Sequence, residues 1–123
     1  MTFDTNILIA YVANEEPVVS ALQQFKRDGA PFILPAMVEA EFLSYSKWDK
    51  AQRIAIEKFL ENHFLFVPLD RSIARIIASI RQQTRLKAAD ASIAATAIFT
   101  NTPLATRNVR DFKNVAGLEL FSF

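Results

Sequence analysis

The sequence predicts an α/β fold with a central parallel sheet of about five strands and helices on both sides. Short apolar segments typical of buried strands alternate with longer segments whose apolar residues recur at helical spacing. Helices between successive strands let those strands run parallel, and a parallel sheet needs cover on both faces. With 123 residues, 51% of them hydrophobic, the chain suits one domain over residues 1–123.

In the first half of the chain, short apolar runs predict strands, and polar or proline residues mark helix starts. The predicted strands are Thr2 to Phe3, Phe32 to Leu34 and Phe64 to Val67. The predicted helices include Ala21 to Lys26, a helix from Pro35 to about Trp48, and Lys50 to Asn62. Gly29 and Pro31 interrupt the first of these, and Pro35 fits the first turn of the second. Asp49 can cap the third.

The second half continues the alternation. Asp70 caps a predicted helix that runs through Thr84, in which isoleucines recur at helical spacing. Asp90 starts the next helix, expected from Ala91 to Thr100. The last predicted elements are a strand at Leu104 to Ala105, a short helix at Asn108 to Lys113 and a strand at Leu118 to Phe121.

The composition excludes several kinds of site. The chain has no cysteine, so disulfides and thiolate chemistry are excluded, and a reducing cytoplasm is expected. Its single histidine, His63, cannot form the histidine pair of ribonuclease A-type catalysis. The apolar run Ile7 to Val12 is too short for a membrane span or a signal peptide. We therefore expect a cytoplasmic protein with no membrane partner.

Four acidic residues stand where the pattern predicts strand ends or apolar helix faces, namely Asp4, Glu41, Asp90 and Asp111. A carboxylate in apolar surroundings must be protonated, ion-paired or bound to a metal. Ligands of a parallel sheet gather at the carboxyl ends of its strands, where Asp4 and the loop from Thr106 to Asp111 are expected. Convergence of the four acids on a divalent cation is the interpretation that this placement favours.

The charge balance is compatible with an acidic site that faces a polyanion. The net charge is +1, from 14 basic and 13 acidic residues. If the four acids share one site, 9 acidic residues remain against 14 basic ones elsewhere. Such an exterior can attract a nucleic acid, although scattered basic residues also serve solubility.

Asp4 and Asp90 each have a competing structural interpretation. Asp4 precedes the apolar run Ile7-Leu8-Ile9 and fits a helix N-cap, and Asp90 fits the same role before its helix. Arg85 and Lys87, just before Asp90, can instead guide a phosphate toward that acid.

Glu41 falls within an apolar stripe along one helix face, at about 100° per residue. The stripe consists of Met37, Val38, Phe42, Tyr45 and Trp48. Glu39 falls on the other side with Ser46 and Lys47, and is expected to be a solvated surface charge. Glu41 is therefore the candidate ligand, and the alternative is an ion pair with an arginine at the edge of the core.

The segment after the fourth predicted strand is rich in polar groups. Asp111 lies three residues after Asn108, the spacing of a helix cap followed by an acidic third position. Thr106 and Asn108 can also orient water at a metal, and Arg107 and Arg110 can contact phosphate. The combination favours a site over a simple cap.

Four motifs occur in order along nearly the whole chain. They are Asp4-Thr5-Asn6-Ile7-Leu8-Ile9, Ala40-Glu41-Phe42, Asp90-Ala91-Ser92-Ile93-Ala94-Ala95-Thr96-Ala97 and Thr106-Arg107-Asn108-Val109-Arg110-Asp111-Phe112. Together they resemble the PIN-domain family, in particular the VapC-like ribonuclease toxins of prokaryotic toxin-antitoxin pairs.

The resemblance implies a divalent-metal-dependent endoribonuclease with Mg²⁺ or Mn²⁺ at one end of a PIN-like sheet. It assigns Asp4, Glu41 and Asp90 as metal ligands, and leaves the fourth position to Asp111 or Asn108. Thr106 and Asn6 would be supporting polar residues, and Arg85, Lys87, Arg107 and Arg110 candidate contacts for RNA phosphates. It also implies hydrolysis to a 5′-phosphate and a 3′-hydroxyl, a small inhibitory antitoxin as partner, and a toxin homodimer.

Two other functions remain as alternatives. A magnesium-binding phosphoacceptor signalling domain has a similar size and also places acids at strand ends, with Asp70 as the acceptor here. That class needs adjacent acids after the first strand and a lysine, usually before proline, after the last, whereas Asp4 precedes Thr5 and no Lys-Pro occurs. The second alternative is a catalytically silent PIN-like interaction module, which the presence of all four acids disfavours.

Overall fold

A five-stranded parallel sheet lies at the centre of the protein, in a computed structural model that describes residues 1–45 and 47–123. The strands are β1 (Thr2–Phe3), β2 (Ile33–Pro35), β3 (Leu65–Val67), β4 (Leu104–Ala105) and β5 (Leu120–Phe121). Their spatial order is β3-β2-β1-β4-β5, and every pairing is parallel. The predicted sheet is confirmed, although β2 is shifted by one residue and β3 and β5 begin slightly later in the chain than predicted.

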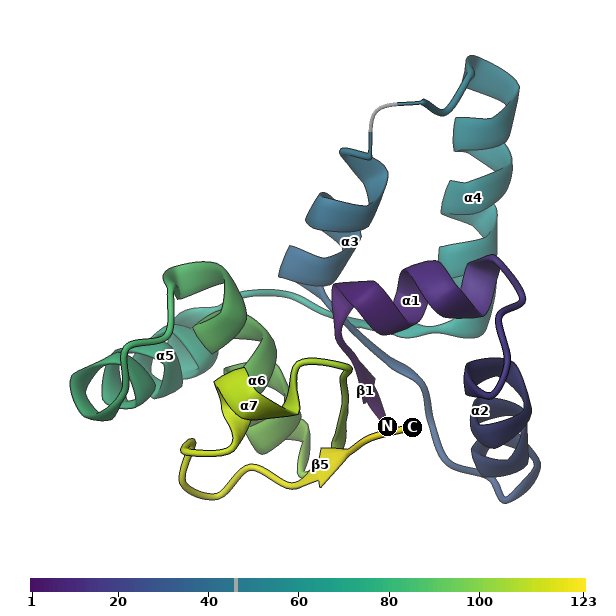
Figure 1. The fold of residues 1–123 in the computed structure, drawn as a ribbon. Coiled ribbons are helices and arrows are strands. Elements are labelled where there is room, and N and C mark those ends of the chain that lie inside the picture. The colour runs from purple at the N-terminus through teal and green to yellow at the C-terminus, as the bar shows by residue number, and fades with distance from the viewer. Residues whose placement is uncertain (46) are drawn as a thin grey trace.

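Helices cover both faces of the sheet, as predicted. They are α1 (Thr5–Val12), α2 (Val18–Arg27), α3 (Ala36–Leu43), α4 (Lys50–His63), α5 (Arg71–Gln83), α6 (Ala88–Thr100) and α7 (Val109–Phe112). From β1 the chain adds β2 and β3 on one side, and it then returns past β1 to add β4 and β5 on the other side. Connections between parallel strands are usually right-handed, so this reversal places the later helices on the opposite face of the sheet. Figure 1 shows α5, α6 and α7 together on one side of the strands, and α1, α2 and α4 on the other. Within the described ranges, no helix has the length and apolar character needed to cross a membrane.

The core has a different composition on each face of the sheet. Phe3 of β1 is fully buried, and its ring centre lies 4.9 Å from that of Phe32, 5.0 Å from Phe64 and 5.8 Å from Tyr11. On the other face, α6 is buried at every position from Ala91 to Ala97. Most of these residues are small, so the helix can pack closely on the sheet and on α5.

The helix predicted from Pro35 to about Trp48 is shorter at both ends. Pro35 is the last residue of β2 and the N-cap of α3 rather than part of its first turn, and α3 ends at Leu43. The hydroxyl of Ser44 donates to the carbonyl oxygen of Glu41 at 2.8 Å. A serine hydroxyl that binds the preceding turn competes with continued helix. The N-cap of α4 by Asp49, with its capping box, then starts a new helix in another direction.

The early end of α3 changes the predicted apolar stripe. Tyr45 is 64% exposed and does not belong to it. Trp48 still packs on Phe42, at 5.7 Å between ring centres, but it does so from the loop. Ser46, expected on the polar face, lies outside the described residues.

The prediction that Glu39 is a solvated surface charge is wrong. Glu39 is half-buried. Burial raises the pKa of Glu39, and the charges of Glu57 and Glu61 on α4 raise it further. Helical spacing within α3 alone could not predict this, because Glu57 and Glu61 come near Glu39 only once α3 and α4 are placed in the fold.

The start of α6 also differs from the prediction. The helix begins at Ala88 rather than Ala91, because Ala88 and Ala89 are strong helix formers. Lys87 occupies the N-cap position without a side-chain capping bond. Asp90 is therefore the third helical residue and does not cap the helix.

We expect Phe3→Ala to lower the free energy of unfolding by about 3 to 5 kcal/mol, because it leaves a cavity between β1 and three other rings. Phe99→Ala serves as the matched control, since Phe99 is 49% exposed and its truncation is expected to cost less than about 1 kcal/mol. Urea unfolding curves of both variants measure the difference. Equal losses in the two variants would contradict the central position of Phe3.

Candidate active site

The candidate site lies at the carboxyl edge of the sheet, where β1 and β4 are neighbours. These two strands continue over opposite faces of the sheet, β1 into α1 and β4 into α7. Such a switch point leaves a crevice at the strand ends of an open α/β sheet. Asp4 directly follows β1 and Thr106 directly follows β4, and their side chains meet across 102 positions of sequence.

Asp4 is 4% exposed and receives hydrogen bonds from both sides of the crevice. Its Oδ1 accepts the backbone N–H of Thr5 at 2.7 Å. Its Oδ2 accepts the Thr106 hydroxyl at 2.7 Å and the Asn6 amide at 3.2 Å. Asp4 also caps α1, so the capping interpretation is correct. The cap does not exclude a site, because it fixes the same carboxylate at the crevice.

Thr106 and Asn6 connect Asp4 to the loop after β4. Thr106 is fully buried, and its hydroxyl oxygen also accepts the backbone N–H of Asn108 at 2.9 Å. The side-chain Oδ1 of Asn6 accepts the backbone N–H of Arg107 at 3.3 Å. The two predicted supporting residues therefore tie the ends of β1 and β4 together.

Glu41 is half-buried on α3 and contacts the start of α1. Its Oε1 accepts the Thr5 hydroxyl at 2.6 Å. The alternative pairing of Glu41 with an arginine is not found, because the ion pairs among the described residues join Arg53 to Glu57 and Arg107 to Glu15.

Asp90 and Asp111 complete the acidic edge from the other face of the sheet. Asp90 is half-buried in the first turn of α6, and Asp111 is exposed on α7. The cap spacing at Asn108 does not produce a capping box, because its side chain makes no capping bond and its N–H is bound by Thr106. The Asp111 side chain therefore makes no capping hydrogen bond to the N–H of Asn108.

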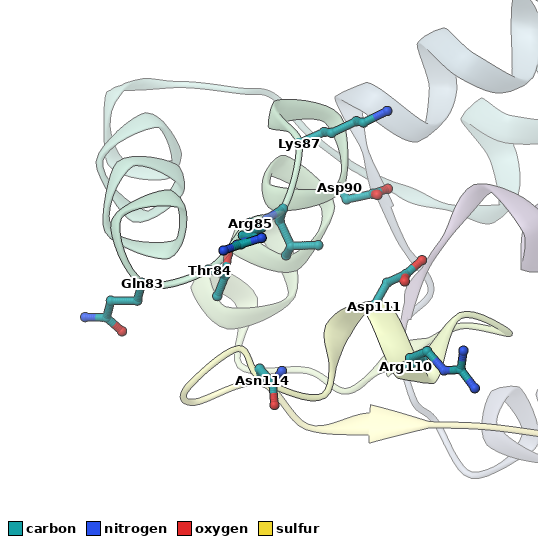
Figure 2. A pocket seen from close by; sticks show the side chains of 9 residues that line it. Gln83, Thr84, Arg85, Lys87, Asp90, Arg110, Asp111 and Asn114 are labelled. Atoms are coloured by element: carbon teal, nitrogen blue, oxygen red, sulfur yellow. The ribbon is translucent and has the colours of Figure 1, made fainter.

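An open pocket of about 680 Å³ lies beside Asp90 and Asp111. Three of the four predicted phosphate-binding cations also line it, namely Arg85, Lys87 and Arg110. Figure 2 shows both carboxylates pointing toward the faint purple chain of β1 and α1, with Lys87 beside Asp90. The basic groups therefore border Asp90 and Asp111, whereas Asp4 and Glu41 do not line this pocket.

Arg107, the fourth predicted cation, lies elsewhere. Its guanidinium is paired with Glu15 of the loop after α1, at 3.1 Å, and both side chains are about half exposed. The sequence offered no sign of this partner, because Glu15 approaches only when α1 and the loop after β4 are placed side by side.

The electrostatics of Asp4 report a crowded acidic site. Burial raises the pKa of Asp4, and the charges of Asp90 and Glu41 also raise it. The hydrogen bonds from the Thr106 hydroxyl and the Thr5 backbone act in the opposite direction.

Asp90 shows the same pattern. Burial raises the pKa of Asp90, followed by the charges of Glu41 and Asp111, while Lys87 lowers it. Asp90 and Glu41 are thus close enough to Asp4 to raise its pKa, and Asp111 is close enough to raise the pKa of Asp90. None of them forms a salt bridge within the described part of the chain.

The donor set fits a hard divalent cation. All four acids supply oxygen, and a cation would offset the burial and mutual repulsion that raise the pKa values of Asp4 and Asp90. As the described side chains stand, no group of three His, Cys, Asp or Glu residues converges closely enough to enclose an ion. Mg²⁺ does not require such a cage, since it keeps several waters and binds through one or two carboxylates.

Comparison with known proteins settles the family. A family model described as the PIN domain matches residues 1–118. The chain is a PIN-domain protein. This PIN domain is 28% identical over 131 residues to "Ribonuclease VapC1" of Rickettsia felis, across 99% of this chain and 95% of that relative.

Solved structures show the same fold. A toxin-antitoxin complex from Klebsiella pneumoniae contains a chain with a TM-score of 0.79 and 27% identity to this PIN domain, across 99% of this chain and 98% of that chain. A chain of VapBC2 from Rickettsia felis, bound to a promoter DNA fragment, has a TM-score of 0.84 and 20% identity, across 99% and 97%. The resemblance noted from the four motifs is confirmed.

The raised pKa of Asp4 predicts the pH dependence of stability without metal. A carboxyl with a raised pKa in the folded state binds more protons folded than unfolded, so stability falls as pH rises above the ordinary aspartate pKa of about 3.9. Asp4→Asn removes this dependence and keeps the cap, because asparagine caps helices as well as aspartate. Urea unfolding in chelator, from pH 4 to pH 8, should show the wild type losing stability relative to the variant. If the difference in free energy of unfolding between wild type and variant stayed constant from pH 4 to pH 8, the raised pKa of Asp4 would be contradicted.

Proposed function

We propose that this PIN domain is a divalent-metal-dependent endoribonuclease and the toxin of a toxin-antitoxin pair, acting in the cytoplasm. The observation that carries the proposal is the group of four acids at the switch point, which form no salt bridge among the described residues, with Lys87 near Asp90. The name of the Rickettsia felis relative, a ribonuclease, supports the reaction class.

Asp4, Glu41 and Asp90 are the residues that we assign to Mg²⁺ or Mn²⁺, with Asp111 as a fourth ligand or a ligand through water. When bound, the metal supplies Lewis acidity toward a phosphodiester and lowers the pKa of water. The role of Asn6 and Thr106 is to keep the Asp4 carboxylate oriented through hydrogen bonds of 3.2 Å and 2.7 Å. The products are a 5′-phosphate and a 3′-hydroxyl.

The basic residues of the pocket suit an RNA backbone. Arg85 and Lys87 precede α6, and Arg110 lies on α7, so cations border the acids from two elements. These cations lie near Asp90 and Asp111, where they can offset the repulsion of phosphate by the acids. Arg107 would first have to leave Glu15 to contribute.

The proposed partners are RNA, a small antitoxin and a second copy of the chain. Support for the antitoxin comes from the Klebsiella pneumoniae neighbour, which is a toxin-antitoxin complex, and from VapBC2 of Rickettsia felis, which is bound to a fragment of promoter DNA. A phosphoacceptor function has no comparable support, since Asp70 follows the edge strand β3 and its side chain caps α5 through the N–H of Ile73.

Nuclease assays test the reaction. Purified protein with structured RNA should cleave in Mg²⁺ or Mn²⁺ and stop in chelator, and Asp4→Asn or Asp90→Asn should reduce the rate by roughly 100-fold or more, since a metal contributes several kcal/mol. Asp70→Asn is the matched control, because it keeps a helix cap away from the site and should retain activity. Cleavage that is unchanged by chelator and by both substitutions would contradict the metal-nuclease proposal. A wild type that does not cleave RNA would favour a catalytically silent interaction module.

Salt dependence tests the phosphate contacts. In an Asp4→Asn background that preserves the RNA, Lys87→Gln should weaken RNA binding and reduce the slope of log affinity against log salt by about 0.7, the value for one single-strand phosphate contact. Lys58→Gln on α4 is the control, since Lys58 is exposed and does not line the pocket. A filter-binding titration at four salt concentrations measures both slopes. If the two variants had the same slope of log affinity against log salt, Lys87 would not be an RNA phosphate contact.

A further inference from the structure

Thr5 contacts two of the four acids through two different atoms. Its backbone N–H donates to Oδ1 of Asp4 at 2.7 Å, and its hydroxyl donates to Oε1 of Glu41 at 2.6 Å. Asp4 directly follows β1, whereas Glu41 comes 36 residues after Thr5, on α3. One residue therefore joins two carboxylates that come from separate elements.

The two acids depend on Thr5 to different degrees. Asp4 also accepts hydrogen bonds from Asn6 and Thr106, so its orientation has independent support. For Glu41, the Thr5 hydroxyl is the side-chain donor found within the described residues. A glutamate has three rotatable side-chain bonds, so a carboxylate with one donor is oriented by that donor.

Thr5 itself is well placed for this task. It is half-buried at the first position of α1, directly after the Asp4 cap. Its β-branched side chain has few allowed rotamers, so the hydroxyl direction follows from the backbone of α1. The hydrogen bond to Glu41 therefore holds the carboxylate of this α3 residue in a fixed position relative to β1 and α1.

We propose that Thr5 is a positioning residue of the metal site, whose hydroxyl orients Glu41 beside Asp4 before a cation binds. This inference rests on the proposed function, since it assigns both acids to the metal. Outer hydrogen-bond donors to metal ligands commonly affect metal affinity because they fix ligand orientation. A purely structural role, in which the bond only fastens α1 to α3, predicts lower stability without a change in metal affinity.

The experiment measures Mn²⁺ binding directly, by calorimetry and by electron paramagnetic resonance, alongside the free energy of unfolding in chelator. Thr5→Val removes the hydroxyl and keeps the shape and the backbone N–H. We expect its Mn²⁺ affinity to fall by about tenfold, the lower end of the range for such donors. Thr5→Ser restores the hydroxyl and should recover most of the affinity. Thr5→Ala replaces Thr5→Val if the latter does not fold.

Thr100→Val is the matched control for loss of a threonine hydroxyl. Thr100 lies at the far end of α6 from Asp90, and its hydroxyl donates to the carbonyl oxygen of Thr96 at 2.9 Å. The substitution should lower stability and leave Mn²⁺ affinity unchanged. An affinity loss equal to that of Thr5→Val would overturn the specific role of Thr5.

A double-mutant cycle with Glu41→Gln tests the route of the effect. If Thr5 acts through Glu41, then Thr5→Val costs little further affinity once Glu41 is replaced. An undiminished loss in the Glu41→Gln background, unchanged binding by Thr5→Val, or a Thr5→Ser variant as weak as Thr5→Val would each overturn the inference. Wild-type protein that binds no Mn²⁺ would overturn the proposed metal function as well, which separates the two failures.

Discussion

The pairing of β1 with β4 is the constraint on which the candidate site depends. It places Asp4 next to Thr106, and the 2.7 Å hydrogen bond between them links the carboxyl ends of the two strands. The central position of β1 also brings α1 against α3, where Thr5 meets Glu41. Without this strand pairing, the acids would belong to separate surfaces.

The site concentrates negative charge in a place where the fold stabilises it only in part. Hydrogen bonds from Thr106 and Thr5 favour the Asp4 carboxylate, but burial and two neighbouring acids oppose its charge. Without metal, the stability of the fold therefore favours a neutral Asp4, whereas the proposed metal binding requires its charged form. The aromatic core around Phe3 supplies the apolar burial that lets the sheet tolerate such a cluster at its edge.

The sequence predicted the elements better than the contacts between them. Short apolar runs located the five strands, and helical spacing placed Glu41 on the side of α3 that contacts α1, because these features depend on local sequence. The end of α3 at Leu43 and the partial burial of Glu39 were missed, since they follow from Ser44 and from the packing of α4. The Thr5 to Glu41 bond was missed for a similar reason, because it requires the relative position of two helices.

The order of the strands has a consequence for folding. β1 is the first strand in the chain, yet one of its two neighbours in the sheet is the fourth, so the Thr2 to Leu104 pairing must close a loop of about 100 residues. Contacts of such long sequence separation form slowly. A nascent chain that has not yet emerged as far as β4 lacks Thr106 and Asp111, and the acidic edge is therefore among the last parts of the molecule to be assembled during synthesis.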